Sequence, residues 1–148
     1  MDRKPSLNFI SERIKFNLKS KTRIKNWIFE TIEKEQQQPG TICYVFCNDH
    51  YLLEINREYL EHDYYTDIVT FDYSQQKSGQ RKAKIISGDL FISVDRVKDN
   101  AVQLGLPFEE ELRRVMVHGV LHLLGYSDKN SVRKKEMKKK EDLYLSRF

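Results

Sequence analysis

Apolar residues recur at helical spacing in several stretches of the chain. In residues 22–37 they form one stripe, made of Ile24, Trp27, Ile28 and Ile32. One apolar stripe on an otherwise polar segment is typical of a helix that buries a single face. We expect Thr22 to cap this helix, and Pro39 with Gly40 to separate it from the next element.

Two helices are predicted in the middle of the chain. Asn48 and Asp49 are suitable caps for a helix that reaches about Leu60. A second helix, over residues 95–104, should end at Gly105, because glycine takes the left-handed conformation of a helix C-cap without steric cost.

Two further helices are expected in the last third. Pro107 suits the first turn of one, where a missing N–H costs little, and three glutamates follow at its positive end. We expect the last of these, Glu111, to be a solvated residue of the helix start. The final helix, over residues 131–145, should expose its lysines and bury Val132, Met137 and Leu145.

Runs of β-branched and aromatic residues predict the strands, which we place at 7–10, 41–47, 66–73 and 84–94. The last two should pair across the polar loop 74–82. Helices interspersed with these strands predict an α+β fold, a small mixed sheet of about four strands packed with helices. At 148 residues, with no linker or internal repeat, we expect one domain over residues 1–148.

The candidate chemistry is concentrated at the end of a central helix. His118 and His122 are four residues apart, so on a helix both imidazoles can reach one ion. Gly125 can then end the helix and turn the chain, which lets Asp128 approach as a third ligand. Three protein ligands leave a coordination position open, and an open position is typical of catalytic rather than structural zinc sites.

The residue after the first histidine narrows the chemistry. Zinc peptidases of the His-Glu-x-x-His type need a glutamate there as general base, whereas this chain has Gly119. A metallopeptidase is therefore disfavoured. Two histidines and a carboxylate also serve non-haem iron oxygenases, which rank last because nothing in the sequence indicates a cosubstrate site.

The run from His118 to Asp128 resembles the signature of the YbeY family, metal-dependent endoribonucleases associated with ribosomal RNA maturation. That signature reads His-Gly-x-Leu-His-Leu-x-Gly-Tyr-Asp-His, and seven of its nine specified positions are identical here. Ser127 and Asp128 replace the last two, so the third ligand changes type. The segments 66–71 and 88–90, together with Asn56, also resemble family segments.

The resemblance implies a single-strand endoribonuclease that acts on ribosomal RNA, at the 3′ end of 16S rRNA, in ribosome biogenesis. Its partner would be the small ribosomal subunit. One departure bears on activity: the family usually carries an arginine after the aromatic residue at Tyr59, implicated in RNA cleavage, and here Leu60 occupies that position. Arg57, one helical turn earlier, is a possible substitute.

Zinc is the first candidate for the ion, since it can lower the pKa of a coordinated water to roughly 7 and polarise a phosphoryl oxygen. Asp128 would make that water less acidic than a third imidazole would, and its oxygen also admits other divalent transition metals. Asp89 and Glu111 are candidates for proton transfer. Arg114, one turn before His118, is the candidate for positioning phosphate.

Charge and composition fit an RNA partner inside the cell. The net charge is +4, and basic residues gather at 13–25, 77–84 and 133–140, where they either track a phosphate backbone or form solvated faces. Cys43 and Cys47 lack metal or disulfide spacing and are expected to be buried free thiols. Without a cysteine framework, signal segment or membrane-length apolar run, we expect a cytoplasmic protein without a membrane role.

Other histidines and aromatic residues are secondary candidates. His50 and His62 are expected in surface turns rather than at the metal. Three tyrosines could stack unpaired bases or simply pack: Tyr64, Tyr65 and Tyr126. The alternative for the whole chain is a non-catalytic ribosome assembly or RNA-binding factor with a structural metal, an interpretation that Leu60 favours.

Overall fold

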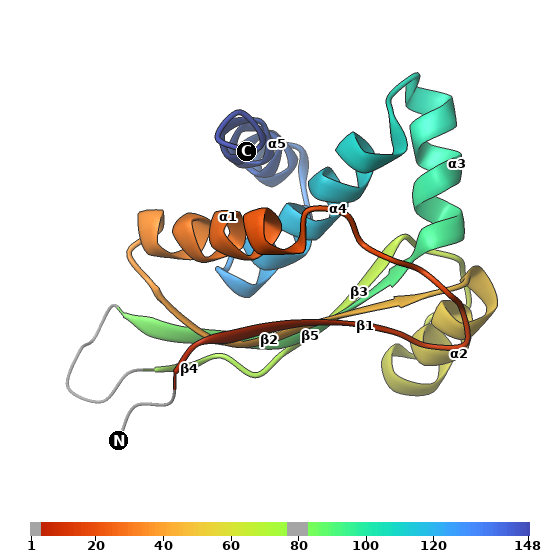
Figure 1. Ribbon diagram of the computed structural model, residues 1–148, viewed down its shortest axis with the longest axis horizontal. Helices are drawn as coiled ribbons and strands as arrows, with labels where there is room; N and C mark the ends of the chain where they lie inside the picture. Colours follow the sequence, from red (N-terminus) through yellow and green to blue (C-terminus); the bar gives the residue numbers. More distant parts are fainter. Residues whose placement is uncertain (1–3, 77–82) are drawn as a thin grey trace.

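The computed structural model describes residues 4–76 and 83–148, which form a mixed sheet and a set of helices (Figure 1). In chain order the elements are β1 (Ser6–Ser11), α1 (Lys21–Lys34), β2 (Gln38–Cys47), α2 (Asp49–Leu60), β3 (Ile68–Asp72), β4 (Gln75–Gln76), β5 (Lys84–Ser93), α3 (Val94–Leu104), α4 (Phe108–Leu123) and α5 (Ser131–Leu145).

The sheet has the order β1-β2-β5-β3, with the short β4 also paired to β5. β1, β2 and β5 run parallel, whereas β3 and β4 are antiparallel to β5. The α+β fold with a mixed sheet is therefore confirmed, and so is the pairing of the strands on either side of the 74–82 loop. Within that loop, residues 77–82 lie outside the described part of the chain, as does most of the basic cluster 77–84.

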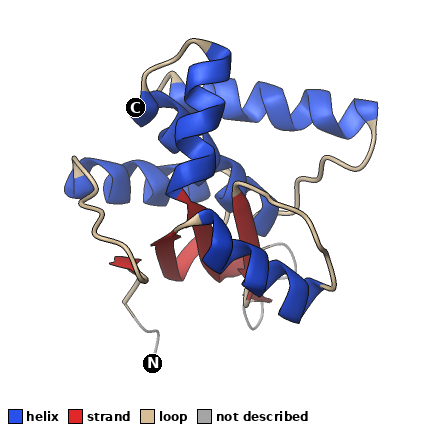
Figure 2. Ribbon diagram, turned by 90° about the vertical axis from the view of Figure 1, so that its right-hand side faces the viewer, coloured by secondary structure: helices blue, strands red, loops and turns tan. Residues whose placement is uncertain are grey.

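Helices α1, α4 and α5 lie over one face of the sheet, while α2 lies against the other (Figures 1 and 2). The main core fills the first interface with fully buried side chains such as Phe46 and Leu90 from the sheet and Met116 from α4. A smaller cluster around Leu52 and Val69 packs α2 against the second face. Helix α4 is thus held between the sheet and the outer helices, which makes it a rigid support for a site.

The first helix begins and ends differently from the prediction. It starts at Lys21, and its cap is Ser20 in a left-handed conformation without a side-chain hydrogen bond, so Thr22 is not the cap. It also ends at Lys34, before the predicted boundary. Pro39 and Gly40 then belong to β2, where Pro39 pairs with Ile86 and the register shifts before Ile42. Pairing with β5 extends the strand through a Pro-Gly sequence that locally predicts a break.

The other helix boundaries agree more closely. The Asn48 side chain accepts a hydrogen bond from the Tyr51 N–H at 2.8 Å, and Gly105 ends α3 with φ at 67°. In α5 the prediction for Met137 is confirmed, but Val132 is 71% exposed and was wrongly assigned to the interior. The inward stripe of α5 instead continues through Glu141 and Tyr144.

Neither cysteine forms a disulfide. Cys47 is buried, which raises the pKa of its thiol to about 12, while Cys43 is only half-buried. Among the helices of the described residues, none combines the length and apolar character that a bilayer span requires.

Candidate metal centre

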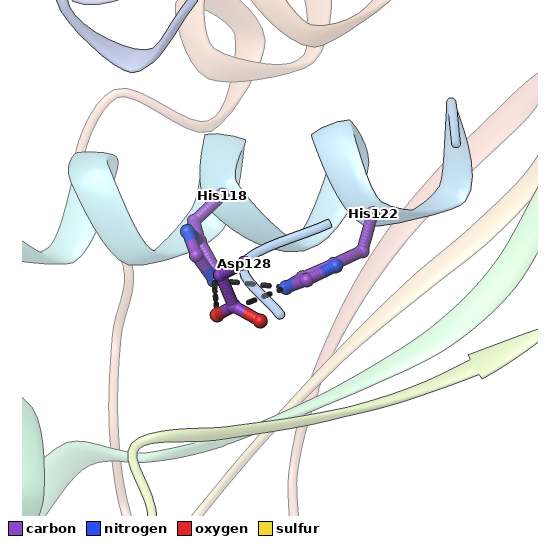
Figure 3. Close-up of side chains that lie close together, drawn as sticks. All are labelled: His118, His122 and Asp128. Carbon is purple, nitrogen blue, oxygen red and sulfur yellow. Dashed lines mark hydrogen bonds and ion pairs between the residues drawn. The ribbon is translucent and has the colours of Figure 1, made fainter. Parts of the chain in front are cut away.

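Three side chains predicted to form a metal site lie together at the C-terminal end of α4 (Figure 3). His118 and His122 share one face of the helix, and their Nε2 atoms are 3.0 Å apart. The chain turns at Gly125, whose φ is 102°, and Asp128 then faces the pair. Its Oδ2 is 3.8 Å from His118 Nε2 and 3.9 Å from His122 Nε2.

The remaining ring nitrogens fix the direction of both imidazoles. His118 Nδ1 lies 2.7 Å from Glu141 Oε2, and His122 Nδ1 lies 3.0 Å from the carbonyl oxygen of Tyr126. A carboxylate and a carbonyl both accept hydrogen bonds, so each Nδ1 carries a hydrogen and donates it. In neutral imidazoles, both Nε2 lone pairs then point into the same space.

Two lone pairs that face each other at this separation repel, and a cation between or beside them would remove that repulsion. Two nitrogens bound tetrahedrally to one zinc ion would be about 3.3 Å apart, given zinc–nitrogen bonds of about 2.0–2.1 Å. The observed 3.0 Å is close to that spacing, and Asp128 needs only a small movement to join. Burial, together with the neighbouring His118, lowers the pKa of His122. The donor set therefore fits a divalent metal ion.

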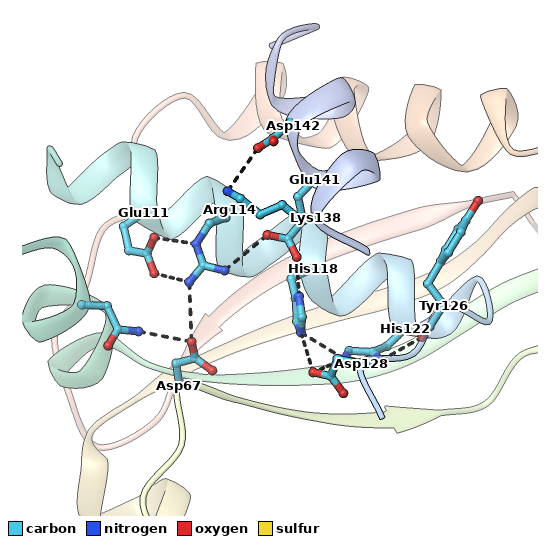
Figure 4. Close-up of polar contacts among 11 residues, drawn as sticks. Asp67, Glu111, Arg114, His118, His122, Tyr126, Asp128, Lys138, Glu141 and Asp142 are labelled. Carbon is cyan, nitrogen blue, oxygen red and sulfur yellow. Dashed lines mark hydrogen bonds and ion pairs between the residues drawn. The ribbon is translucent and has the colours of Figure 1, made fainter. Parts of the chain in front are cut away.

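A network of ionic groups supports His118 from behind (Figure 4). Arg114 donates to Glu111 through Nε at 2.7 Å and again through a terminal nitrogen, and to Glu141 at 3.3 Å. Asp67 lies 4.0 Å from the same guanidinium. The bonds to Glu111 are the largest of the interactions that raise the pKa of Arg114, so its charge is permanent.

Glu111 differs from the expectation of a solvated residue. Its side chain is fully buried and bound to Arg114, because α3 and α5 cover this part of α4. Glu111 therefore serves as an anchor for a cation.

Asp89 lies away from the histidines. Its neighbours on β5, Gly88 and Leu90, face α4: a Cβ on Gly88 would meet Leu123, and the Leu90 side chain lies beside Gly119. Because side chains alternate along a strand, Asp89 points to the opposite face of the sheet, where its charge, after burial, is a cause of the raised pKa of Tyr73. Asp89 is thus separated from His118 and His122 by the sheet itself.

Gly119 allows close packing within the protein. A Cβ there would lie 2.6 Å from Ile68 Cδ1 and 3.0 Å from Leu90 Cδ2. The glycine thus brings α4 down onto β3 and β5, which places the histidines at the edge of the strands.

The metal centre opens into a cleft of about 510 Å³ between α4 and the segment from the end of α2 through β3. Among the described residues, its lining includes no lysine or arginine. The residues that line it are Asn56, Leu60, His62, Tyr64, Thr66, Asp67, Ile68, Val69, Thr70, Asp72, His118, His122, Leu123 and Asp128. Arg57 is not part of this lining, and its guanidinium is paired with Asp63.

The other two histidines and Tyr126 lie in different environments. His50 is exposed in the first turn of α2, rather than in a loop, and lies 3.1 Å from Glu54. His62 stacks on Tyr64 at the rim of the cleft, with ring centroids 5.1 Å apart. Tyr126 faces inward, because its hydroxyl donates to Glu35.

Glu141, the carboxylate that orients His118, is a functional residue that the sequence pattern did not single out. A signal was present: Met137, Glu141 and Tyr144 follow helical spacing, so a charged residue interrupts an otherwise apolar stripe. A buried acid at such a position needs a cationic or hydrogen-bonding partner.

The chain is similar to several known proteins over most of its length. A family model described as Endoribonuclease YbeY matches residues 7–148. Endoribonuclease YbeY of Flavobacterium psychrophilum is 46% identical over 135 residues, covering 91% of each chain, and that of Cytophaga hutchinsonii is 45% identical over 138 residues, covering 93% of this chain and 92% of the relative. The solution structure of TM1509 from Thermotoga maritima is similar with a TM-score of 0.63 at 26% identity, over 95% of this chain and 87% of the other.

Proposed function

This chain belongs to the YbeY family, and on that premise we propose that it is a metal-dependent endoribonuclease that hydrolyses phosphodiester bonds in single-stranded RNA. We further propose that it acts as a single domain in the cytoplasm. Its substrate would be ribosomal RNA, at the 3′ end of 16S rRNA, and its partner the small ribosomal subunit.

One observation carries the enzymatic proposal. Two imidazoles whose Nδ1 atoms are already bound present their Nε2 lone pairs 3.0 Å apart, with a half-exposed carboxylate beside them at the wall of a cleft. Two nitrogen ligands and one oxygen ligand suit zinc, and other divalent transition metals remain compatible. When bound, such an ion supplies a Lewis acid that activates water and polarises a phosphoryl oxygen.

The protein groups around the site have distinct tasks. His118, His122 and Asp128 would hold the ion, and Asp128 completes the set from an exposed turn. Arg114 touches the site through Glu141, so we assign it to positioning rather than to direct phosphate contact. Asp89 lies on the far face of the sheet, and we therefore give it no step in the reaction.

The dimensions and rim of the cleft favour a single strand. The cleft opens at the surface between α4 and the segment from the end of α2 through β3, and the exposed rings of His62 and Tyr64 at its rim suit unpaired bases. Among the described residues the cleft lining brings three carboxylates and no lysine or arginine, so we expect the metal ion, rather than a protein cation of this lining, to stabilise the charge on the scissile phosphate during cleavage.

The lack of a lysine or arginine among the described residues of this lining favours a second candidate, a non-catalytic RNA-binding or assembly factor with a structural metal. Leu60 in place of the family arginine removes a cation that would otherwise assist cleavage. In that case the ion would hold the turn after α4 against the helix and contribute mainly to stability.

Asp128→Ala separates the two candidates. An enzyme should lose cleavage of a structured RNA by about 100-fold or more while keeping its RNA affinity, because the ligand that closes the metal site is gone. A metal-stabilised adaptor should lose thermal stability and RNA binding together. Asp99→Ala, at an exposed position of α3, is the matched control and should leave cleavage, affinity and stability unchanged.

A further inference from the structure

Helix α5 contributes to the support of both histidines, although it supplies no ligand itself. Glu141 contacts His118 directly, and Lys140 and Tyr144 join Glu35, which holds Tyr126 beside His122. We infer that α5 sets the direction of both imidazoles of the metal centre through these two separate polar networks. The inference rests on the proposed metal site and deepens it.

The first network fixes His118 through both oxygens of one carboxylate. Glu141 Oε2 accepts from His118 Nδ1 at 2.7 Å, while Oε1 accepts from Arg114 Nη1 at 3.3 Å. The Glu141 side chain is only 5% exposed. Because each oxygen has a different donor, the carboxylate cannot rotate without losing these hydrogen bonds. The ring of His118 cannot rotate without losing its own bond to Oε2.

Arg114 is in turn held from several elements. Glu111, one turn earlier on α4, binds it with both carboxylate oxygens and is fully buried. Asp67, before β3, lies 4.0 Å away and accepts a hydrogen bond from Asn100 of α3 at 3.2 Å. The orientation of Glu141 is therefore tied to α3, α4, α5 and the segment that leads into β3.

The second network fixes His122 through the backbone. Its Nδ1 donates to the Tyr126 carbonyl at 3.0 Å, so the position of the turn after α4 decides where the ring points. The hydroxyl of Tyr126 donates to Glu35 just beyond the end of α1. From α5, Lys140 donates to the same carboxylate at 2.9 Å and Tyr144 through its hydroxyl.

Both networks restrict the rotation of a ligand ring. A ligand ring that lacks its outer hydrogen bond can rotate and change tautomer, and loss of such outer partners typically weakens metal binding. Glu141 and Tyr126 are thus positioning residues, and neither is expected to touch RNA.

The test uses the full chain, freed of metal by a chelator and titrated with Co²⁺ alone, whose visible absorption reports ligand geometry. Glu141→Gln is the main variant, because one amide cannot accept from both His118 and Arg114. We expect its Co²⁺ affinity to fall about 10- to 100-fold, with an altered spectrum. For RNA cleavage, kcat should fall while KM stays unchanged, since the cleft is not modified.

Two more variants complete the design. Tyr126→Phe removes the hydroxyl that Glu35 holds, and its Co²⁺ affinity should fall about tenfold, at the low end of the same range. Glu136→Gln, the same substitution as in the main variant but at an exposed position of α5, should keep wild-type affinity, spectrum and kcat. Thermal unfolding of the metal-free proteins identifies any variant that fails to fold.

Wild-type affinity and spectrum in Glu141→Gln would overturn the inference. If that variant does not fold, the same result for Tyr126→Phe would overturn it. A wild-type protein that binds no Co²⁺ would instead refute the proposed metal site and the inference with it. A wild-type protein that binds Co²⁺ and cleaves RNA, beside an unaltered Glu141→Gln, would leave the proposed function intact and remove only the role of α5.

Discussion

The two walls of the cleft are built differently. On the helix wall, formed by α4 and the turn that follows it, His118 and His122 are mostly covered, with side chains 19% and 29% exposed, and each ring is held by a hydrogen bond from its Nδ1. On the strand wall, formed by the end of α2, the loop after it and β3, Tyr64 is 55% exposed and Leu60 38%. Fixed geometry suits a reacting centre, and an exposed aromatic surface suits a substrate whose bases vary.

The largest expected effect comes from removing one ligand of the helix wall. His122→Ala should reduce RNA cleavage by more than about 100-fold and lower metal content, because a direct ligand matters more than the outer partners whose loss costs 10- to 100-fold. Metal analysis and single-turnover cleavage measure both effects.

The same substitution on the strand wall is the matched comparison. His62→Ala should leave metal content unchanged and weaken RNA binding by about tenfold, since the loss of a stacking ring costs roughly 1–3 kcal/mol per base. If His62→Ala lost the metal as His122→Ala does, the two walls would not have separate tasks.

The second prediction concerns Gly88 of β5, which packs against both β3 and α4. A Cβ on Gly88 would lie 2.5 Å from the Phe71 carbonyl oxygen and 2.9 Å from Leu123 Cδ2, so the backbone of β3 would have to shift and the Leu123 side chain of α4 would have to move. Gly88→Ala should lower the free energy of unfolding by about 1–3 kcal/mol, measured by denaturant titration.

Gly119→Ala is its control on the helix wall. Its Cβ would meet Ile68 Cδ1, the end of a flexible side chain, and the gain of about 1 kcal/mol from replacing glycine in a helix offsets part of the crowding. A larger loss of stability in Gly119→Ala than in Gly88→Ala would contradict this account of how the walls pack.

The same contrast explains what the sequence could predict. The helix wall follows from local signals: the spacing of His118 and His122, and Gly125 as the residue that turns the chain toward Asp128. The residues that support this wall do not follow from local signals. Glu141 lies 23 residues after His118 on another helix, and their contact depends on how α5 packs.

Two further properties do not follow from the sequence: whether a side chain is buried, and which face of the sheet it lies on. Glu111 has the position of a solvated helix-start residue, and only the packing of α3 and α5 makes it a buried anchor. Asp89 was a candidate by residue type alone, whereas the register of β5 turns it to the opposite face. Local sequence predicts the ligand spacing and the ends of α2, α3 and α5, although not those of α1, and the contacts between elements decide which side of a sheet a residue serves.

The third prediction tests the effect of a positive charge at Leu60 on the strand wall. Leu60→Arg adds a cation to a lining that has no lysine or arginine among the described residues, and should raise kcat/KM for RNA by about tenfold, corresponding to roughly 1.4 kcal/mol. The gain should shrink with added salt, because an exposed charge is screened. Leu60→Met, of similar size without the charge, is the control, and an equal gain in both variants would exclude an electrostatic cause.

The smallest expected effect tests the support that α1 gives to the helix wall. Burial alone would raise the pKa of Glu35, but the hydrogen bonds from Tyr126, Tyr144 and Lys140 outweigh it and hold the pKa below its ordinary value. A carboxylate with a lowered pKa stabilises the folded state above its unfolded pKa, and that contribution is lost as the pH falls through the folded pKa.

Glu35→Gln should therefore be less stable than the wild type by about 1 kcal/mol at pH 7, because the amide keeps a hydrogen-bond acceptor but loses the charge. The difference should begin to close as the pH falls below the ordinary glutamate pKa of about 4.5, and it should be lost as the pH falls through the lower pKa of the folded state. Glu33→Gln, at an exposed position two residues earlier, should follow the wild-type profile. If the difference between Glu35→Gln and wild type stayed constant down to pH 3, the ionised carboxylate would not be what holds Tyr126, and the helix wall would depend on Glu141 alone.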